Sequence, residues 1–352
     1  MSWELVNRQS EADRALACLS GVAANLPNPH LLIRPFMRKE AVLSSRIEGT
    51  QASLSDLFWF EADVTEQSDA ASEDALEVSN YVTALEYGLS RLEELPPSLR
   101  LLRELHERLL SGVRGGNLTP GYFRDSQNWI GPAGCPLPEA VYVPPPPEKL
   151  MDVLGPFEDY LHTDNNLPPL IRLALIHYQF EAIHPFLDGN GRIGRLLIIL
   201  LMCHWQLLSE PLLYLSAYFN RNRQRYYQLL LNVSLKGSWL DWIEFFLQGV
   251  AEQARDATHR SMELLGLWDF YRERLRSPGA SALQLKLLDE LFALPVVTTR
   301  RARELLDVTP KTALNNIDKL VDAGILEEVT GKKRYKVWVA PEIIDTVQGP
   351  DE

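Results

Sequence analysis

The chain has 352 residues, of which 46% are hydrophobic, and a formal net charge of −12. This length exceeds what one small core needs and predicts two or three domains with a sizeable buried interior. Because the chain is acidic, nucleic-acid binding along its whole length is excluded, and any such contact must be local. The three cysteines, Cys18, Cys135 and Cys203, are too widely spaced for a disulfide framework or a zinc site.

Two further observations concern the location of the protein. The first residues, MSWELVNRQSEADR, lack the basic start and apolar run of a signal peptide. The longest apolar run, residues 196–203, is far too short to span a bilayer. The sequence therefore predicts a cytoplasmic protein without a membrane segment.

Helical periodicity dominates the sequence up to about residue 275. Leucines between residues 99 and 110 recur at helical spacing after Ser98, whose side chain is a suitable N-cap. The expected fold class is therefore mainly α. Similar patterns predict further helices at residues 11–26, 36–48, 73–95, 168–183, 190–207, 222–235 and 239–275.

One segment in this helical region has the pattern of a β-hairpin. Residues Gln127–Val143 contain two β-prone stretches that flank a region rich in glycine and proline. Pro144–Pro147 end the pattern, because proline cannot donate to a strand ladder.

The pattern changes after Ser277–Ser281, which reads as a linker. Beyond it the sequence predicts a helix at 283–293, a second from Thr299, a third from Thr309 and a hairpin at Ile325–Val339. Three helices and a two-stranded wing are typical of a winged helix-turn-helix. We therefore divide the chain into an N-terminal helical segment (1–110), a core (111–276), a linker (277–281) and a C-terminal winged-helix-like domain (282–352).

The segment with the clearest chemistry is residues 184–195, which read HPFLDGNGRIGR. An apolar helix delivers a histidine to its end, a glycine-rich turn follows, and a second apolar helix begins. Free N–H groups at a helix N-terminus favour anions, and two arginines in the first turn make sense if a polyphosphate lies there. The alternative interpretation is a helix–loop–helix with ordinary surface charges. It does not explain why two arginines and a histidine lie at the junction of two apolar helices.

Two residues of this segment have the right chemistry for phosphate transfer. His184, with an unperturbed pKa near 6.5, is a suitable general base near neutral pH. Asp188 is a suitable ligand for Mg²⁺, which commonly binds one or two carboxylates together with substrate phosphates.

This segment resembles the Fic family signature H-P-F-x-D/E-G-N-G-R-x-x-R and matches all nine specified positions. The resemblance implies a Fic helical bundle and an enzyme that moves AMP from ATP onto a Ser, Thr or Tyr hydroxyl of a protein, with release of pyrophosphate. It implies that His184 deprotonates the hydroxyl and that Asp188 binds Mg²⁺. It assigns the ATP phosphates to the remaining signature residues: Gly189, Asn190 and Gly191 as an anion hole, Arg192 and Arg195 on the β- and γ-phosphates, and Ile193 and Gly194 between them.

The resemblance extends to both sides of the signature. It places Tyr227 in the adenine pocket, although Tyr226 and Tyr227 would equally suit the edge of a core. It makes the hairpin at Gln127–Val143 a flap that holds the target protein by strand addition. A hairpin that merely covers the core is the alternative.

A second motif, Ser44-Ser45-Arg46-Ile47-Glu48-Gly49, resembles the inhibitory pattern S/T-x-x-x-E-G/N of the family. Ser44 and Glu48 lie one helical turn apart on the same face. The resemblance implies that Glu48 pairs with Arg195 and displaces the γ-phosphate of ATP. An exposed glutamate at a helix end is the alternative reading.

The C-terminal module carries a local positive charge on an acidic chain. Residues 281–340 hold ten Lys/Arg and eight Asp/Glu, and the helix from Thr309 has a polar face of Lys311, Thr312, Asn315, Asn316 and Lys319. This predicts either weak DNA contact or docking to a protein, including a second copy of the chain.

Three functions stay open from the sequence alone. The first is a self-inhibited AMP transferase, including self-modification. The second is a nucleotide-sensing regulator that binds DNA or protein, although a sensor would not need His184. The third is removal of AMP from a modified protein, with Glu48 positioning water.

Overall fold

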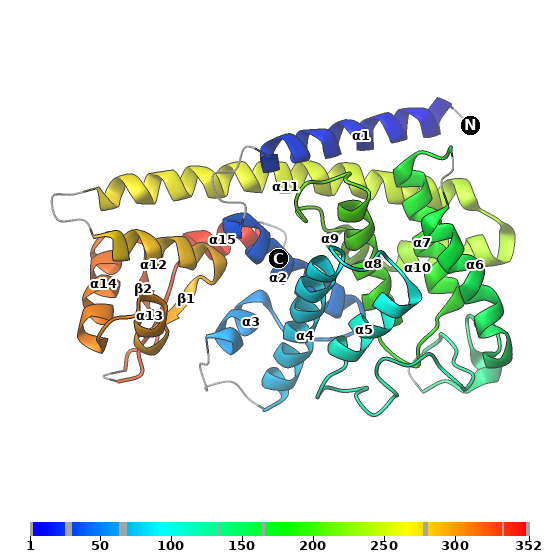
Figure 1. The fold of residues 1–352 in the computed structure, drawn as a ribbon, viewed down its shortest axis with the longest axis horizontal. Helices are drawn as coiled ribbons and strands as arrows, with labels where there is room; N and C mark the ends of the chain where they lie inside the picture. Colours follow the sequence, from blue (N-terminus) through cyan, green and yellow to red (C-terminus); the bar gives the residue numbers. More distant parts are fainter. Residues whose placement is uncertain are drawn as a thin grey trace.

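The computed structural model describes residues 3–24, 30–62, 69–132, 134–163, 166–276, 281–332 and 334–349. These residues form a mainly helical protein, which confirms the predicted fold class (Figure 1). The helices before residue 277 are α1 (Trp3–Ala24), α2 (His30–Ile47), α3 (Leu54–Glu61), α4 (Asp69–Arg91), α5 (Leu99–Leu109), α6 (Leu150–His162), α7 (Pro169–Ile183), α8 (Asn190–His204), α9 (Ser216–Arg221), α10 (Arg223–Lys236) and α11 (Trp239–Leu275).

Side-chain caps explain several of the helix starts. The Ser98 side chain accepts a hydrogen bond from the N–H of Leu101 and begins α5, as predicted. Ser53 and Asp56 form a reciprocal capping box at the start of α3. The sequence analysis did not anticipate α3, α6, α9 or the final helix, since all but α6 have eight residues or fewer and show little periodicity.

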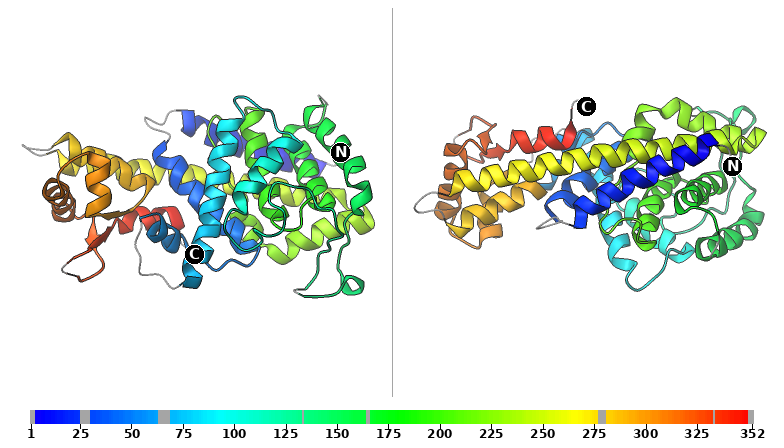
Figure 2. Two further views of the ribbon diagram at one scale, coloured as in Figure 1. Left: turned by 60° about the horizontal axis from the view of Figure 1, so that its bottom comes forward. Right: turned by 90° about the horizontal axis from the view of Figure 1, so that it is seen from above.

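Helices α1 and α11 form the long edge of the molecule. They run side by side over most of the length of α1, as Figure 1 and the right view of Figure 2 show. The C-terminal end of α11 extends past the helical bundle to the C-terminal module (Figure 1). None of the helices described here is long and apolar enough to cross a membrane.

The C-terminal module contains three helices, a small sheet and a final helix. Its elements are α12 (Ala282–Ala293), β1 (Val296–Thr298), α13 (Thr299–Leu306), α14 (Pro310–Asp322), β2 (Glu327–Glu328), β3 (Val337–Val339) and α15 (Pro341–Gln348). The sheet has three antiparallel strands in the order β1-β3-β2, whereas a two-stranded wing was expected. The extra strand arises because Val296 and Val297 are buried against β3. The predicted linker lies almost wholly outside the described residues.

The polar face predicted for α14 needs one correction. Asn316 is buried, and its side-chain amide donates to the carbonyl of Thr312 at 2.8 Å. Lys311, Asn315 and Lys319 are exposed as predicted.

Helix α2 lies between the helical bundle and the C-terminal module. It packs against α4 and α9 on one side and against α12 and α15 on the other. The ammonium group of Lys39 donates to the carbonyls of Val347 and Gln348, at 3.1 and 2.8 Å, at the C-terminal end of α15. A cation at this end of a helix stabilises the unpaired carbonyls.

The segment predicted as a flap is only a minimal hairpin. Ile130 and Tyr142 form an isolated antiparallel bridge, with Ile130 N donating to Tyr142 O at 2.9 Å. The residues between them turn through a short 3₁₀ helix, Leu137–Glu139.

Candidate active site

The signature turn joins α7 to α8. His184 follows α7 in the left-handed conformation, with φ of 49°, and its N–H still donates to the carbonyl of Phe180. Gly189, with φ of 76°, precedes α8, a conformation that glycine adopts without strain. The turn therefore brings the imidazole of His184 and the N-terminus of α8 to the same pocket.

Two asparagines hold the turn closed. The buried side chain of Asn190 accepts from Phe186 N and donates to Phe186 O, both at 2.8 Å. The amide of Asn128 donates to the same carbonyl at 2.8 Å and to His184 O at 3.2 Å. The side chain of Asn190 thus fixes the backbone of the turn.

His106 on α5 contacts the turn through its ring. Gly121 N donates to its Nδ1 at 2.9 Å, so Nε2 carries the proton and donates to Asp188 O at 3.0 Å. The ring stacks on Phe186 with centroids 3.9 Å apart. Burial lowers the pKa of His106 to about 4, which keeps the ring neutral.

Arg124 supports the other side of the turn. Its Nε donates to His184 O at 2.9 Å, and its backbone N–H donates to Pro185 O at 2.9 Å. The side chain is buried. The sequence analysis singled out neither His106 nor Arg124, because a single histidine on a leucine-rich helix and a single arginine before a hairpin show no local pattern.

A pocket of about 510 Å³ opens beside the turn. Its predicted phosphate-binding end is formed by Glu48, His184, Gly191 and Arg195. The flap, α7 and α10 form its other walls through Trp129, Ile130, Gly131, Val141, Tyr142, Tyr178, Glu181, Ala182, Arg223, Tyr226, Tyr227, Leu230, Leu231 and Ser234.

The contacts and burial of His184 indicate its protonation state. Its Nδ1 lies 3.3 Å from Glu181 O, and because a carbonyl oxygen only accepts, Nδ1 carries the proton and Nε2 is the basic atom. Burial lowers the pKa of His184 to about 4, well below the value of 6.5 assumed from the sequence. The ring is therefore neutral at pH 7.

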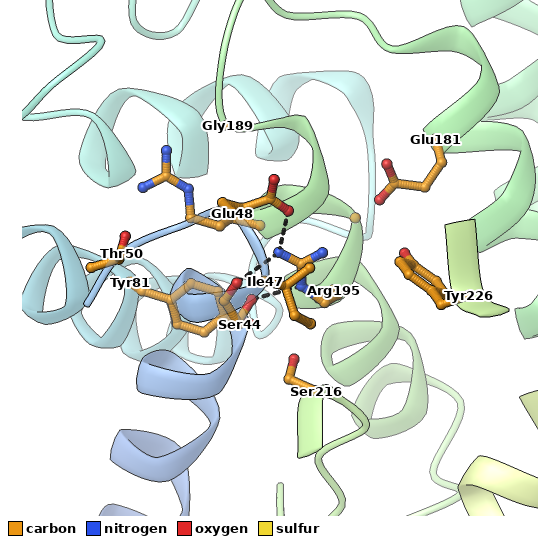
Figure 3. Close-up of polar contacts among 12 residues, drawn as sticks. Ser44, Ile47, Glu48, Thr50, Tyr81, Glu181, Gly189, Arg195, Ser216 and Tyr226 are labelled. Atoms are coloured by element: carbon orange, nitrogen blue, oxygen red, sulfur yellow. Dashed lines mark hydrogen bonds and ion pairs between the residues drawn. The ribbon is translucent and has the colours of Figure 1, made fainter. Parts of the chain in front are cut away.

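Arg195 is held by the predicted inhibitory motif. Its Nε donates to Ser44 Oγ at 2.8 Å, and its NH2 group donates to Ser44 O at 2.9 Å and to Glu48 Oε1 at 2.6 Å (Figure 3). Burial by itself would raise the pKa of Glu48, but the charge of Arg195 outweighs it and holds that pKa below its ordinary value. Glu48 is therefore a carboxylate at neutral pH and forms an ion pair with Arg195, the second arginine of the signature.

Arg192 is held by a second glutamate, which the sequence did not reveal. Its NH1 group donates to Glu77 Oε1 at 2.5 Å, and the two side chains are only 3% and 4% exposed. Thr50, two residues after Glu48, donates to the same Glu77 oxygen at 3.2 Å. Glu77 thus connects the signature helix α8 to the turn that carries Glu48.

The pocket receives only part of the predicted set of residues. Beside the four residues of the phosphate-binding end, it includes Tyr227, which is 40% exposed, whereas Tyr226 is buried and bonds His177 at 2.8 Å. Asp188, Gly189, Asn190, Arg192, Ile193 and Gly194 are absent from the described pocket wall. Ile193 is fully buried, and Gly194 packs against Phe180 and Glu181.

A buried carboxyl group lies one turn before Ser44. Glu40 is 1% exposed and accepts hydrogen bonds from Ser216 Oγ at 2.5 Å, Ser216 N at 3.2 Å and Tyr81 Oη at 3.2 Å. Burial raises its pKa to about 7. Helix α2 is thus attached to both α4 and α9 through polar contacts inside the core.

The fold and this site together define a class: helical proteins in which a histidine and a glycine-rich helix N-terminus share one pocket. Residues 6–90 match the Fic/DOC family N-terminal region, and residues 96–202 match the Fic/DOC family itself. The two matches together span more than half of the chain, which belongs to the Fic/DOC family.

Individual relatives agree with this assignment. The chain is 30% identical over 215 residues to Protein adenylyltransferase Fic of Drosophila willistoni, a match of 55% of this chain and 40% of the relative. It is 37% identical over 111 residues to the protein of the same name from Drosophila grimshawi, covering 31% and 21% of the two chains. The chain therefore matches less than half the length of these curated relatives.

Solved structures share the fold. A Fic family protein from Desulfovibrio desulfuricans G20 aligns with a TM-score of 0.62 at 18% identity over 97% of this chain and 96% of that chain. Residues 134–508 of Fic-1 from C. elegans align with a TM-score of 0.56 at 22% identity, over 74% of this chain and 73% of that chain.

Proposed function

We propose that the chain transfers AMP from ATP onto a Ser, Thr or Tyr hydroxyl of a protein and that Glu48 inhibits this reaction. The observation that carries the proposal is the pocket in which the basic Nε2 of His184, the N-terminal turn of α8 and Arg195 converge. The name that the curated relatives carry, protein adenylyltransferase, supports the same activity.

His184 supplies the chemistry of the proposed step. Its neutral imidazole accepts the proton of the attacking hydroxyl, whose oxygen then forms a bond to the α-phosphorus while pyrophosphate leaves. The N–H groups of the first turn of α8 and the guanidinium of Arg195 stabilise the phosphate oxygens. The contacts from Arg124 and Asn128 to His184 O keep the base in place.

The residues around Asp188 fit a magnesium ion. The Asp188 side chain is 40% exposed, and its Oδ1 accepts from Gly189 N at 2.6 Å, so one carboxylate remains partly open beside the turn. No cluster of three or more His, Cys, Asp or Glu residues suited to a metal occurs among the residues that the structure describes. Mg²⁺ is commonly held by one or two carboxylates together with substrate phosphates, and beside Asp188 it would neutralise the charge of the departing pyrophosphate.

Inhibition follows from the charge of Glu48. A carboxylate 2.6 Å from Arg195 takes the position of an anionic phosphate and repels the γ-phosphate of ATP. ATP then binds without its arginine contact, and the α-phosphate is displaced from the position that attack requires.

The target protein is proposed to lie along the flap. Trp129, Val141 and Val143 are 40%, 54% and 47% exposed, and Trp129 and Val141 also line the pocket. An extended segment of the target that pairs with this backbone would present its hydroxyl to His184 whatever its sequence.

Labelling with ATP tests the proposal. The full chain is incubated with Mg²⁺ and a cell lysate, in parallel with [α-³²P]ATP and with [γ-³²P]ATP, and the His184→Ala variant serves as the control. We expect protein-bound label from the α-position only, and no label with His184→Ala. Label from the γ-position that is lost with His184→Ala would indicate a kinase and would refute AMP transfer.

A further inference from the structure

Glu181, on the last turn of α7, contains a buried oxygen without a partner. Its side chain is 11% exposed, and Oε1 has no hydrogen-bond partner among the described residues. His177 Nε2 lies 4.0 Å from this oxygen, but that atom interacts with Tyr226 Oη at 2.8 Å. A buried polar atom without a partner is unfavourable in the free protein and marks a place where a ligand can complete the contacts.

The carboxyl group of Glu181 faces the proposed nucleotide pocket. Glu181 is part of the pocket wall, and Figure 3 shows its side chain directed from α7 toward Arg195. Its Oε1 packs against Gly194, where any Cβ would collide with it. The lack of a side chain at Gly194 thus leaves space for this carboxyl group.

Two residues of α7 and the residue directly after it mark positions along the pocket. Tyr178, Glu181 and His184 follow one another at intervals of three residues, which correspond to about 4.5 Å along a helix. His184 lies at the phosphate-binding end. Tyr178 bonds Ser234 Oγ at 2.9 Å at the other end, where Leu230 and Leu231 form an apolar wall suited to a base. Glu181 lies between the two, where the sugar of a nucleotide joins its phosphate to its base.

The charge state of Glu181 suits a sugar hydroxyl. Burial raises its pKa to about 8; the charge of Arg195 opposes this shift and the charge of Glu48 adds to it. The group is therefore mostly protonated at pH 7, so that it donates one hydrogen bond and accepts others. Ribose hydroxyls also donate and accept, and a neutral carboxyl group does not repel the phosphates beside it.

We infer that Glu181 binds the ribose hydroxyls of the nucleotide and makes the pocket selective for ribonucleotides over deoxyribonucleotides. This inference rests on the proposed function, because it requires the pocket to hold a nucleoside triphosphate.

Calorimetric titration of the full chain tests the inference. The His184→Ala background prevents turnover, and dissociation constants are measured with Mg²⁺ for ATP, 2′-deoxy-ATP and 3′-deoxy-ATP. We expect the loss of one hydroxyl to weaken binding roughly tenfold for at least one analogue. With Glu181→Ala added, the three nucleotides should bind equally. With Glu181→Gln added, which keeps a donor and an acceptor, the discrimination should persist. Thermal unfolding of each variant confirms that it is folded.

The outcomes separate this inference from the proposed function. If ATP binds but both analogues bind as tightly with Glu181 intact, the ribose contact is refuted and the nucleotide pocket stands. If Glu181→Ala weakens all three nucleotides by one factor and leaves their ratios unchanged, Glu181 contacts another part of the nucleotide and the inference also fails. If ATP does not bind to any of the proteins, the proposed function itself is refuted.

Discussion

Arg192 and Glu77 form an ion pair that is almost completely shielded from solvent, with NH1 and Oε1 2.5 Å apart. Arg192 NH2 also lies 3.8 Å from Asp188 Oδ1, and Thr50 donates to Glu77. One carboxylate of α4 is therefore in contact with the signature helix α8 and with the turn that follows Glu48. Glu77 provides a direct physical connection between these two functional segments.

Glu77→Gln should destabilise the protein. Removing one partner of a buried ion pair leaves an uncompensated charge and costs about 3–5 kcal/mol. Urea unfolding of the full chain measures this loss. Glu86→Gln, an exposed position on the same helix, is the matched control and should change the free energy of unfolding by less than about 0.5 kcal/mol. Equal effects of the two substitutions would mean that the Arg192–Glu77 pair contributes nothing to stability.

Thr50→Val should partly relieve inhibition. The substitution keeps the shape of the buried side chain but removes its hydrogen bond to Glu77, so the turn that carries Glu48 is held less firmly. We expect AMP transfer to rise several-fold, consistent with the loss of about 1 kcal/mol from one hydrogen bond. Thr83→Val, on the exposed side of α4, should leave transfer unchanged. A fall in transfer with Thr50→Val would show that this contact supports catalysis and not inhibition.

The pH dependence of transfer should reflect the low pKa of His184. Because burial lowers this pKa to about 4, the base stays deprotonated down to about pH 5, and the rate should decline only as the pH approaches 4. Single-turnover rates of the Glu48→Gly variant between pH 4.5 and 8 measure the profile. A half-maximal rate near pH 6.5 would show that the ring titrates as in water and would contradict the buried environment.

Glu40 should make the stability of the protein decrease as the pH rises. The pKa of Glu40 in the folded protein, about 7, is above its ordinary value. The stability that its protonated form contributes is therefore fully present below about pH 4.5 and is lost as the pH rises through 7. Glu40→Gln removes this titration, and its difference in stability from the parent protein should change by roughly 2–3 kcal/mol between pH 4.5 and 8.5. Urea unfolding at both values measures the change. A constant difference would show that Glu40 has the same pKa in the folded and unfolded chain.

The sequence predicted those parts of the fold and site whose signal is local. The long amphipathic helices were predicted from their periodicity, and Ser98 as the N-cap of α5 from a single residue type in front of such a helix. The contact between Glu48 and Arg195 was predicted as well, although the two residues are 147 positions apart, because each belongs to a motif of the family.

The remaining contacts have no local pattern. Glu77, His106 and Arg124 act through hydrogen bonds to residues far away in the sequence, and nothing in the neighbouring sequence distinguishes them from other polar residues. The low pKa of His184 was not predicted either, because the cost of burying its charged form depends on surroundings that only the folded chain supplies.

A double-mutant cycle tests most directly whether Glu48 inhibits AMP transfer through its ion pair with Arg195. Incorporation of label from [α-³²P]ATP is measured for the parent protein, Glu48→Gly, Arg195→Ala and the double variant. We expect Glu48→Gly to raise transfer by about 100-fold, since a misplacement of about 1 Å costs that much in rate. Arg195→Ala should lower transfer, and in its presence Glu48→Gly should have almost no effect. Unchanged transfer with Glu48→Gly alone, or the same gain with and without Arg195, would contradict inhibition through this contact.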